Sequence, residues 1–178
     1  MSAPGWTCIT VIGAECTGKT TLADALGRRL GAPVVPEAAR LFVEREARPV
    51  RRGDEPGIVA LHLAERAKAE AGAIDSRARY LVFDTDLLST VIYARHYQGS
   101  CPPSIVRKAA ALRADLYLVT EPDFPFEADD FQRGSAEDRR AVHELLLDAL
   151  RRRKWPFVQI TGSATARVDE ALRAIDGL

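Results

Sequence analysis

The sequence predicts an α/β domain in which a parallel five-stranded sheet is covered by helices on both faces. Short apolar runs rich in β-branched residues alternate along the chain with longer helical patterns, as in such a sheet. A glycine-bounded loop at 13–20 also joins the first apolar run to the first helical pattern. The chain has 178 residues, the size of one ordinary domain, so we expect residues 1–178 to form a single domain.

The first part of the chain supplies three of the predicted strands and the helices between them. The strands are expected at 8–12, 32–36 and 80–83. The helical patterns lie at 22–30, 37–47 and 56–74. Gly31 follows the first of these helices, where glycine commonly ends a helix.

The second part continues the alternation. Two further helical segments are expected at 87–97 and 104–114, before a fourth strand at 116–119 and a fifth at 155–160. An amphipathic helix between these strands is marked by Val142, Leu145, Leu146, Ala149 and Leu150. A last helix at about 164–175 completes the fold.

Composition argues against several kinds of partner and site. The 25 basic and 25 acidic residues leave no net field to attract nucleic acid or an anionic membrane, so we expect neither partner. No apolar run approaches the ~18 residues that span a bilayer. The cysteines at 8, 16 and 101 form no CxxC pair, which indicates neither a disulfide framework nor a zinc site. A reducing, cytoplasmic location is expected.

The loop at 13–20 reads G-A-E-C-T-G-K-T and matches the phosphate-binding pattern GxxxxGK[ST]. Its glycines let the backbone point N–H groups at a phosphate, at the positive end of the following helix. We expect Lys19 to reach the β- and γ-phosphates of a nucleotide and the Thr20 hydroxyl to hold Mg²⁺. The alternative is an ordinary glycine-rich turn that contains a lysine. The expected nucleotide-binding residues are Gly13, Ala14, Glu15, Cys16, Thr17, Gly18, Lys19, Thr20 and Thr21.

Acidic residues follow three of the predicted strands. Glu37 follows the second strand, Asp84 and Asp86 the third, and Glu121 and Asp123 the fourth. Ligands of open parallel sheets bind at the carboxyl ends of the strands, and Mg²⁺ favours carboxylate ligands. Asp84 is therefore the expected second magnesium residue. Its alternative role, shared by Asp86, is to cap the helix that begins nearby.

The segment 121–134 reads E-P-D-F-P-F-E-A-D-D-F-Q-R-G and lacks helical or strand periodicity. Such a proline-rich, charged segment after a strand is a candidate lid. Arg133 within it and Arg139 in the next helix are expected to reach a transferring phosphate, the alternative being surface charge. The chain has no asparagine and hence no Asn-Lys-x-Asp element, which argues against a GTPase.

A set of motifs, in order along the chain, resembles one protein family. The motifs are G-A-E-C-T-G-K-T-T at 13–21, P-E-A-A-R at 36–40, F-D-T-D-L-L-S-T at 83–90, D-L-Y-L-V-T-E-P-D-F-P-F at 115–126 and D-F-Q-R at 130–133. They are similar to the ribosylnicotinamide kinase domain of the bacterial NadR proteins. The family usually has tyrosine at the position of Ala38, tryptophan at Phe126 and glycine at Phe131. The resemblance implies a P-loop NTPase kinase fold with strand order 2-3-1-4-5.

The same resemblance implies an activity. In that family, ATP with Mg²⁺ phosphorylates the 5′-hydroxyl of nicotinamide riboside and gives nicotinamide mononucleotide. NadR proteins commonly carry an adenylyltransferase domain ahead of the kinase, and we expect the kinase alone here. The alternatives are a kinase for another nucleoside or a polynucleotide 5′-hydroxyl, and a regulatory ATP-binding module.

A carboxylate that accepts the proton of the attacking hydroxyl is required for this chemistry. Glu37 is the first candidate and Asp86 its competitor; the alternative for Glu37 is a helix N-terminal charge. A cationic pyridinium ring suits carboxylates and aromatic faces. The expected acceptor-binding residues are Glu37, Arg40, Asp86, Tyr93, Glu121, Asp123, Phe124 and Phe126. Three scattered histidines, His62, His96 and His143, have no metal-ligand spacing and are given no role.

Overall fold

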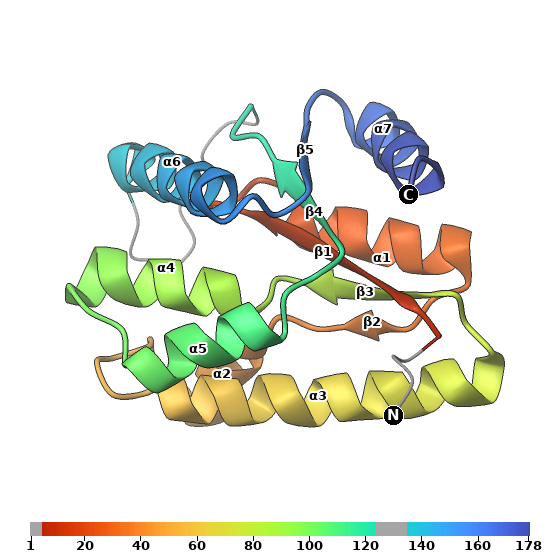
Figure 1. Ribbon diagram of the computed structural model, residues 1–178. Coiled ribbons are helices and arrows are strands. Elements are labelled where there is room, and N and C mark those ends of the chain that lie inside the picture. Colours follow the sequence, from red (N-terminus) through yellow and green to blue (C-terminus); the bar gives the residue numbers. More distant parts are fainter. Residues whose placement is uncertain (1–4, 124–134) are drawn as a thin grey trace.

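A five-stranded parallel sheet forms the centre of the molecule (Figure 1). The computed structural model describes residues 5–123 and 135–178. The strands are β1 (Thr7–Gly13), β2 (Val34–Val35), β3 (Tyr80–Asp84), β4 (Leu116–Thr120) and β5 (Phe157–Ile160). Their order is β2-β3-β1-β4-β5 and every neighbouring pair is parallel, which confirms both the predicted fold class and the predicted strand order.

Helices connect successive strands, as parallel pairing requires. They are α1 (Lys19–Leu30), α2 (Ala38–Glu46), α3 (Glu55–Ser76), α4 (Leu87–Gln98), α5 (Pro103–Ala111), α6 (Ala136–Arg153) and α7 (Ala164–Asp176). Because α1 begins inside the glycine-bounded loop, it starts earlier than the apolar pattern predicts.

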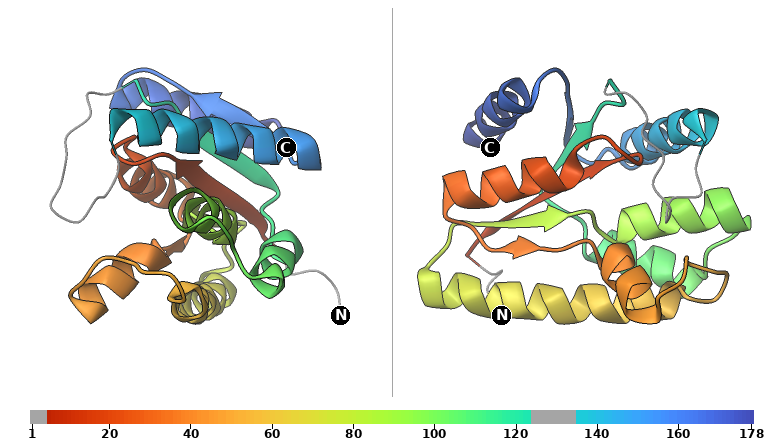
Figure 2. Two further views of the ribbon diagram at one scale, coloured as in Figure 1. Left: turned by 90° about the vertical axis from the view of Figure 1, so that its left-hand side faces the viewer. Right: turned by 180° about the vertical axis from the view of Figure 1, so that it is seen from behind.

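The side chains of β1 alternate between the two faces of the sheet. Ile9 and Val11 pack with α1 and α7 on one face. Cys8 and Ile12 pack with α3, α4 and α6 on the other. Helices therefore cover both faces, as Figure 2 shows from two further sides and as the sequence predicts.

Two strands are shorter than predicted, and prolines explain both. The expected strand at 32–36 reduces to Val34–Val35, which lies at the sheet edge between Pro33 and Pro36. The expected strand at 155–160 begins only at Phe157, after Pro156. Proline has no N–H to donate to a neighbouring strand, so regular pairing stops beside it.

None of the helices in 5–123 or 135–178 is both long enough and apolar enough to cross a bilayer. Cys8, Cys16 and Cys101 form no disulfide bond within the described residues. Parallel strands end at a common edge, so the loops after β1, β3 and β4 meet there. The loop at 13–20, Asp84 and Glu121, which sequence analysis predicted to be functional, lie at this edge.

Candidate functional site

The loop between β1 and α1 approaches its surroundings so closely that it requires glycine. A Cβ atom at Gly13 would collide with the hydroxyls of Thr17 and Thr120. Gly18, at the N-cap of α1, has a left-handed backbone with a φ of 76° and provides no capping side chain. The first N–H groups of α1 are thus left to face a ligand, as in anion sites at helix N-termini.

Two arginines from helices that are distant in the sequence, Arg139 and Arg167, donate hydrogen bonds to backbone carbonyls of this loop. The Nε and Nη2 atoms of Arg139 donate to the carbonyls of Glu15 and Cys16, both at 3.0 Å. Arg167 donates from Nη1 to the carbonyl of Thr17 at 2.6 Å. Arg139 and Arg167 are 5% and 2% exposed, so neither is a surface charge. For Arg139 this excludes the surface alternative and places its guanidinium on the loop backbone.

Lys19 begins α1 at the front of the same loop. Its Nζ donates to the carbonyl of Ala14 at 2.8 Å, which folds the side chain back over the loop. The ammonium group therefore lies beside the N–H groups at the start of α1. Phosphate oxygens are the ligands that this combination favours.

Thr20 and Asp84 form an oxygen pair next to Lys19. The Thr20 hydroxyl donates to Oδ2 of Asp84 at 2.6 Å. Burial raises the pKa of Asp84, against the lowering effects of Thr20 and Lys19. The other carboxylate oxygen, Oδ1, is buried and has no hydrogen-bond partner in the described part of the chain. A hydroxyl beside an unsatisfied carboxylate oxygen fits a hard divalent cation such as Mg²⁺.

No cluster of three or more His, Cys, Asp or Glu side chains that could hold a metal occurs within 5–123 and 135–178. A cation at Thr20 and Asp84 would therefore need further oxygens from outside these residues. Phosphates and water supply these at magnesium–nucleotide sites.

Both carboxylate oxygens of Asp86 accept hydrogen bonds from within the chain. Its Oδ1 accepts from the backbone N–H of Leu88 at 2.9 Å and so caps α4. Its Oδ2 accepts from the Tyr117 hydroxyl at 2.9 Å. Burial raises the pKa of Asp86 to about 6, against these hydrogen bonds. The capping role that the sequence allowed for Asp84 thus belongs to Asp86, while Asp84 ends β3.

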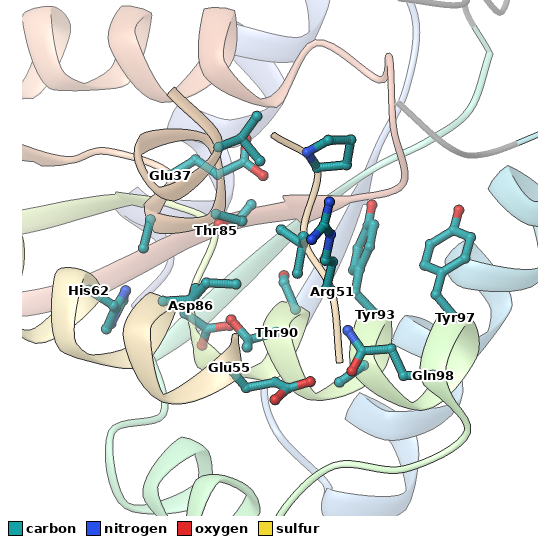
Figure 3. Close-up of a pocket in the computed structure, with 18 of the residues that line it drawn as sticks. Glu37, Arg51, Glu55, His62, Thr85, Asp86, Thr90, Tyr93, Tyr97 and Gln98 are labelled. Carbon is teal, nitrogen blue, oxygen red and sulfur yellow. The ribbon is translucent and has the colours of Figure 1, made fainter. Parts of the chain in front are cut away.

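A cavity of about 490 Å³ opens beside Lys19 (Figure 3). Glu37, at the N-cap of α2, and Tyr93 and Tyr97, on α4, line it from different sides. Apolar side chains of the α2–α3 region form much of the remaining wall: Ala38, Ala39, Val43, Val50 and Ile58. The cavity therefore combines an apolar wall with polar and charged groups from several elements.

Glu37 is the acidic group nearest the loop on the α2 side. Burial raises its pKa, and the nearby Lys19 lowers it by a smaller amount. Arg40 is one helical turn further on, with its Nε 4.0 Å from Oε2 of Glu37. The Arg40 side chain is 56% exposed and is not among the residues that line the cavity, so its predicted contact with an acceptor stays a prediction.

A family profile described as an AAA domain matches residues 8–167, which is most of the chain. The chain belongs to this AAA domain family. It is 27% identical over 157 residues to the trifunctional NAD biosynthesis/regulator protein NadR of Salmonella typhimurium, and 26% identical to the protein of that name from Escherichia coli. These alignments cover 85% of the present chain, which spans about 37% of the length of either relative.

Solved structures agree with the fold of this AAA domain. NadR in complex with NAD and AMP-PNP matches with a TM-score of 0.78 and 24% identity, over 97% of this chain and 49% of that chain. NadR in complex with NR matches with a TM-score of 0.72 and 24% identity, over 97% and 51%. Thymidylate kinase from Ehrlichia chaffeensis matches with a TM-score of 0.62 and 17% identity, over 97% and 100%. The predicted relation to NadR and the P-loop kinase fold are confirmed.

Two carboxylates of the AAA domain lie elsewhere than the sequence predicts. Glu121 and Asp123 were expected at the acceptor cavity, and neither lines it. Glu121 instead accepts from Gln159 at 2.7 Å and contacts His143 at 3.1 Å. Asp123 pairs with Arg167. The strand order explains the correction, because β4 lies on the side of β1 away from β3, whereas the cavity opens toward β3 and α4.

Three expected site residues, Phe124, Phe126 and Arg133, lie outside the described residues, as does most of the lid expected at 121–134. Tyr93 and Asp86 both line the cavity (Figure 3), and their predicted contact with an acceptor stays a prediction. Burial and the neighbouring Glu15 and Glu37 carboxylates raise the pKa of Tyr93.

The structure also brings residues to the cavity that the sequence reasoning missed. Glu55 and His62 on α3 line it and are 4% and 3% exposed (Figure 3). Their separation of seven residues places them on one helix face, a signal that the sequence contains. Tyr97 lies one turn after Tyr93, and its hydroxyl donates to Oε1 of Glu15 at 3.1 Å. Arg51 lines the cavity from the loop between α2 and α3.

Proposed function

We propose that this chain is a kinase that transfers the γ-phosphate of ATP, with Mg²⁺, to the 5′-hydroxyl of nicotinamide riboside and forms nicotinamide mononucleotide. The observation that carries the proposal is the arrangement around Lys19. Lys19 is close enough to act electrostatically on Asp84 of the Thr20–Asp84 oxygen pair and on Glu37, and it lines the same cavity as Glu37.

The phosphate loop accounts for the donor side. Its N–H groups and Lys19 bind the triphosphate, and Thr20 and Asp84 hold Mg²⁺, which neutralises charge on the phosphates. A second cavity of about 540 Å³ lies between α1 and α7, beside Gly18 and Thr21. We assign it to the adenosine part of ATP. The NadR complex with AMP-PNP supports a nucleotide in a fold of this kind.

Glu37 accounts for the acceptor side. Its carboxylate orients the 5′-hydroxyl and accepts the proton as the hydroxyl oxygen bonds to the γ-phosphorus and the bond to the β-phosphate breaks, which releases ADP. The raised pKa of Glu37 makes it a stronger base than an ordinary glutamate. A cavity with the carboxylates of Glu37 and Glu15 and the ring of Tyr93 suits a cationic nucleoside. The NadR complex with NR supports this acceptor.

An ADP-release assay with Mg·ATP tests the proposal. The acceptors are nicotinamide riboside, the common nucleosides and a 5′-hydroxyl oligonucleotide. We expect turnover with nicotinamide riboside that Lys19→Ala abolishes, with Lys108→Ala on the exposed face of α5 as the control. Turnover only with the oligonucleotide or another nucleoside would replace the proposed acceptor. If no acceptor stimulates ADP release, a regulatory ATP-binding role is the better interpretation.

A further inference from the structure

The backbone of the phosphate loop is held from behind at three successive carbonyl groups. Arg139, on the first turn of α6, binds the carbonyls of Glu15 and Cys16. Arg167, near the start of α7, binds the carbonyl of Thr17. Both arginines are buried, so these contacts are fixed by the packing of their helices against the sheet.

Because peptide units are planar, fixing the direction of these carbonyls also fixes the direction of the N–H groups that follow them. A carbonyl and the N–H of the next residue belong to one planar trans unit and point in opposite directions. The described chain has no cis peptide bond. Holding the carbonyls of residues 15–17 toward the arginines therefore directs the N–H groups of Cys16, Thr17 and Gly18 away from them, toward the front of the loop.

Arg167 also fixes where the loop sits on the sheet edge. Its Nε donates to the carbonyl of Gly162 after β5 at 2.9 Å, and its Nη2 donates to the carbonyl of Glu121 after β4 at 3.0 Å. The same side chain pairs with Asp123. One guanidinium thus joins the ends of two strands to the phosphate loop, and its charge lies behind the N–H groups that face the ligand.

We infer that Arg139 and Arg167 are positioning residues of the nucleotide site, which hold the phosphate loop in its anion-binding conformation by binding three successive carbonyls. Arg139 then acts through the loop backbone and not as the group that contacts the transferring phosphate, which is the role the sequence suggested. This inference rests on the proposed function, because it requires that the loop bind a triphosphate.

The test separates positioning from a general effect on folding. Calorimetry with Mg·ATP is carried out on the wild type and on the variants Arg139→Ala, Arg139→Lys and Arg140→Ala. Arg140 is the exposed neighbour of Arg139 on α6 and is the matched control. We expect the Kd for Mg·ATP to rise by about 10- to 100-fold in Arg139→Ala and by less in Arg139→Lys, since lysine can still donate to one carbonyl. Arg140→Ala should bind like the wild type.

Steady-state kinetics provide a second measurement. In Arg139→Ala the KM for ATP should rise clearly more than the KM for nicotinamide riboside, because the N–H groups that the arginines orient face the donor, and of the residues whose carbonyls the arginines bind only Glu15 lines the acceptor cavity. Arg167→Ala should also raise the KM for ATP. Arg173→Ala, on the exposed side of α7, is its control.

The outcomes are distinguishable from failure of the proposed function. If wild-type protein binds no Mg·ATP, the proposed function itself is wrong. If wild type binds Mg·ATP and Arg139→Ala binds it within about threefold as well, the positioning role is overturned. It is also overturned if both KM values rise together, or if neither Arg139 variant folds, because the arginine is then a general stability element.

Discussion

The hydroxyl of Thr20 and the carboxylate of Asp84 lie 2.6 Å apart although 64 residues separate them in the chain. Thr20 is in the first turn of α1, and Asp84 is the last residue of β3. The contact forms because β3 pairs with β1 in a register that opposes Asp84 to Val11, just before the phosphate loop. The parallel pairing of these two strands therefore builds the expected magnesium site.

Replacing Asp84 should separate activity from stability. We expect Asp84→Asn to lower kcat at least ~100-fold, because a neutral amide is a poor magnesium ligand. Thermal stability should stay the same or rise slightly, because burial already disfavours the charge of Asp84. The measurements are kcat over a magnesium titration and the Tm. Exposed Asp75→Asn is the control, and a large loss of Tm in Asp84→Asn would argue for a structural carboxylate instead.

Glu37 and Asp86 can be distinguished as the catalytic base. We expect Glu37→Gln to lower kcat by about 10²- to 10⁴-fold, the usual contribution of a general base. Asp86→Asn should keep kcat within about tenfold, because the amide oxygen of asparagine can still cap the helix while its NH2 group replaces Oδ2 and can donate to the Tyr117 hydroxyl oxygen. Single-turnover rates with saturating ATP measure the chemical step. The reverse ranking of the two variants would assign the base to Asp86.

His62 should make the protein less stable in mild acid. Burial, with a smaller effect of Arg66, lowers the pKa of His62 from 6.5 to about 4. Between these values the unfolded chain binds a proton that the folded state excludes, so stability falls as the pH drops from 6.5 to 4. The loss from this residue is at most about 3 kcal/mol.

Urea unfolding at several pH values checks the prediction for His62. The acid-side decline should be smaller in His62→Gln than in the wild type. Asp86, whose pKa is raised to about 6, acts in the opposite direction as the pH changes. It is present in both proteins, so its contribution cancels in the comparison. Identical pH profiles would show that His62 titrates normally in the folded state.

Two glycine-to-alanine changes should have opposite effects on stability. Gly13→Ala introduces a Cβ into the space of the Thr17 and Thr120 hydroxyls, and we expect it to destabilise the fold by about 1–3 kcal/mol. Gly72→Ala lies inside α3, where the nearest outside atom would be 3.9 Å away, in Pro33. It should stabilise the fold by roughly 0.5–1 kcal/mol through helix propensity. Equilibrium unfolding measures both, and equal effects would contradict the packing described for the loop.

Several features of the site could be predicted because they are local in the chain. The strand, glycine-bounded loop and helix at 7–30 follow from residue types within one short segment. The positions of Lys19 and Thr20 are fixed by that segment. The placement of Asp84 at the carboxyl end of β3 could be predicted from the apolar run of that strand and from the alternation of strands and helices that indicates a parallel sheet. The cytoplasmic location and the lid at 121–134 stay predictions.

Other features depend on contacts between distant parts of the chain. Asp86 and Tyr117 are 31 residues apart, and their hydrogen bond, which commits Asp86 to structure, appears in no local pattern. Arg139 reaches the loop across more than 100 residues, so its residue type alone did not distinguish a phosphate contact from a backbone contact. Glu55 and His62 line the cavity because α3 packs beside α4.

The amino-acid sequence by itself determined the fold class, the strand order through the family resemblance, and the loop that faces a phosphate. Periodic burial and glycine conformations act over a few residues, so they can be read along the chain. Only the tertiary structure decided that Glu121 and Asp123 face α6 and α7 and that Glu37 faces the cavity. The physical reason is that the direction of a side chain after a strand depends on which neighbours flank that strand in the sheet, and those neighbours come from elsewhere in the chain.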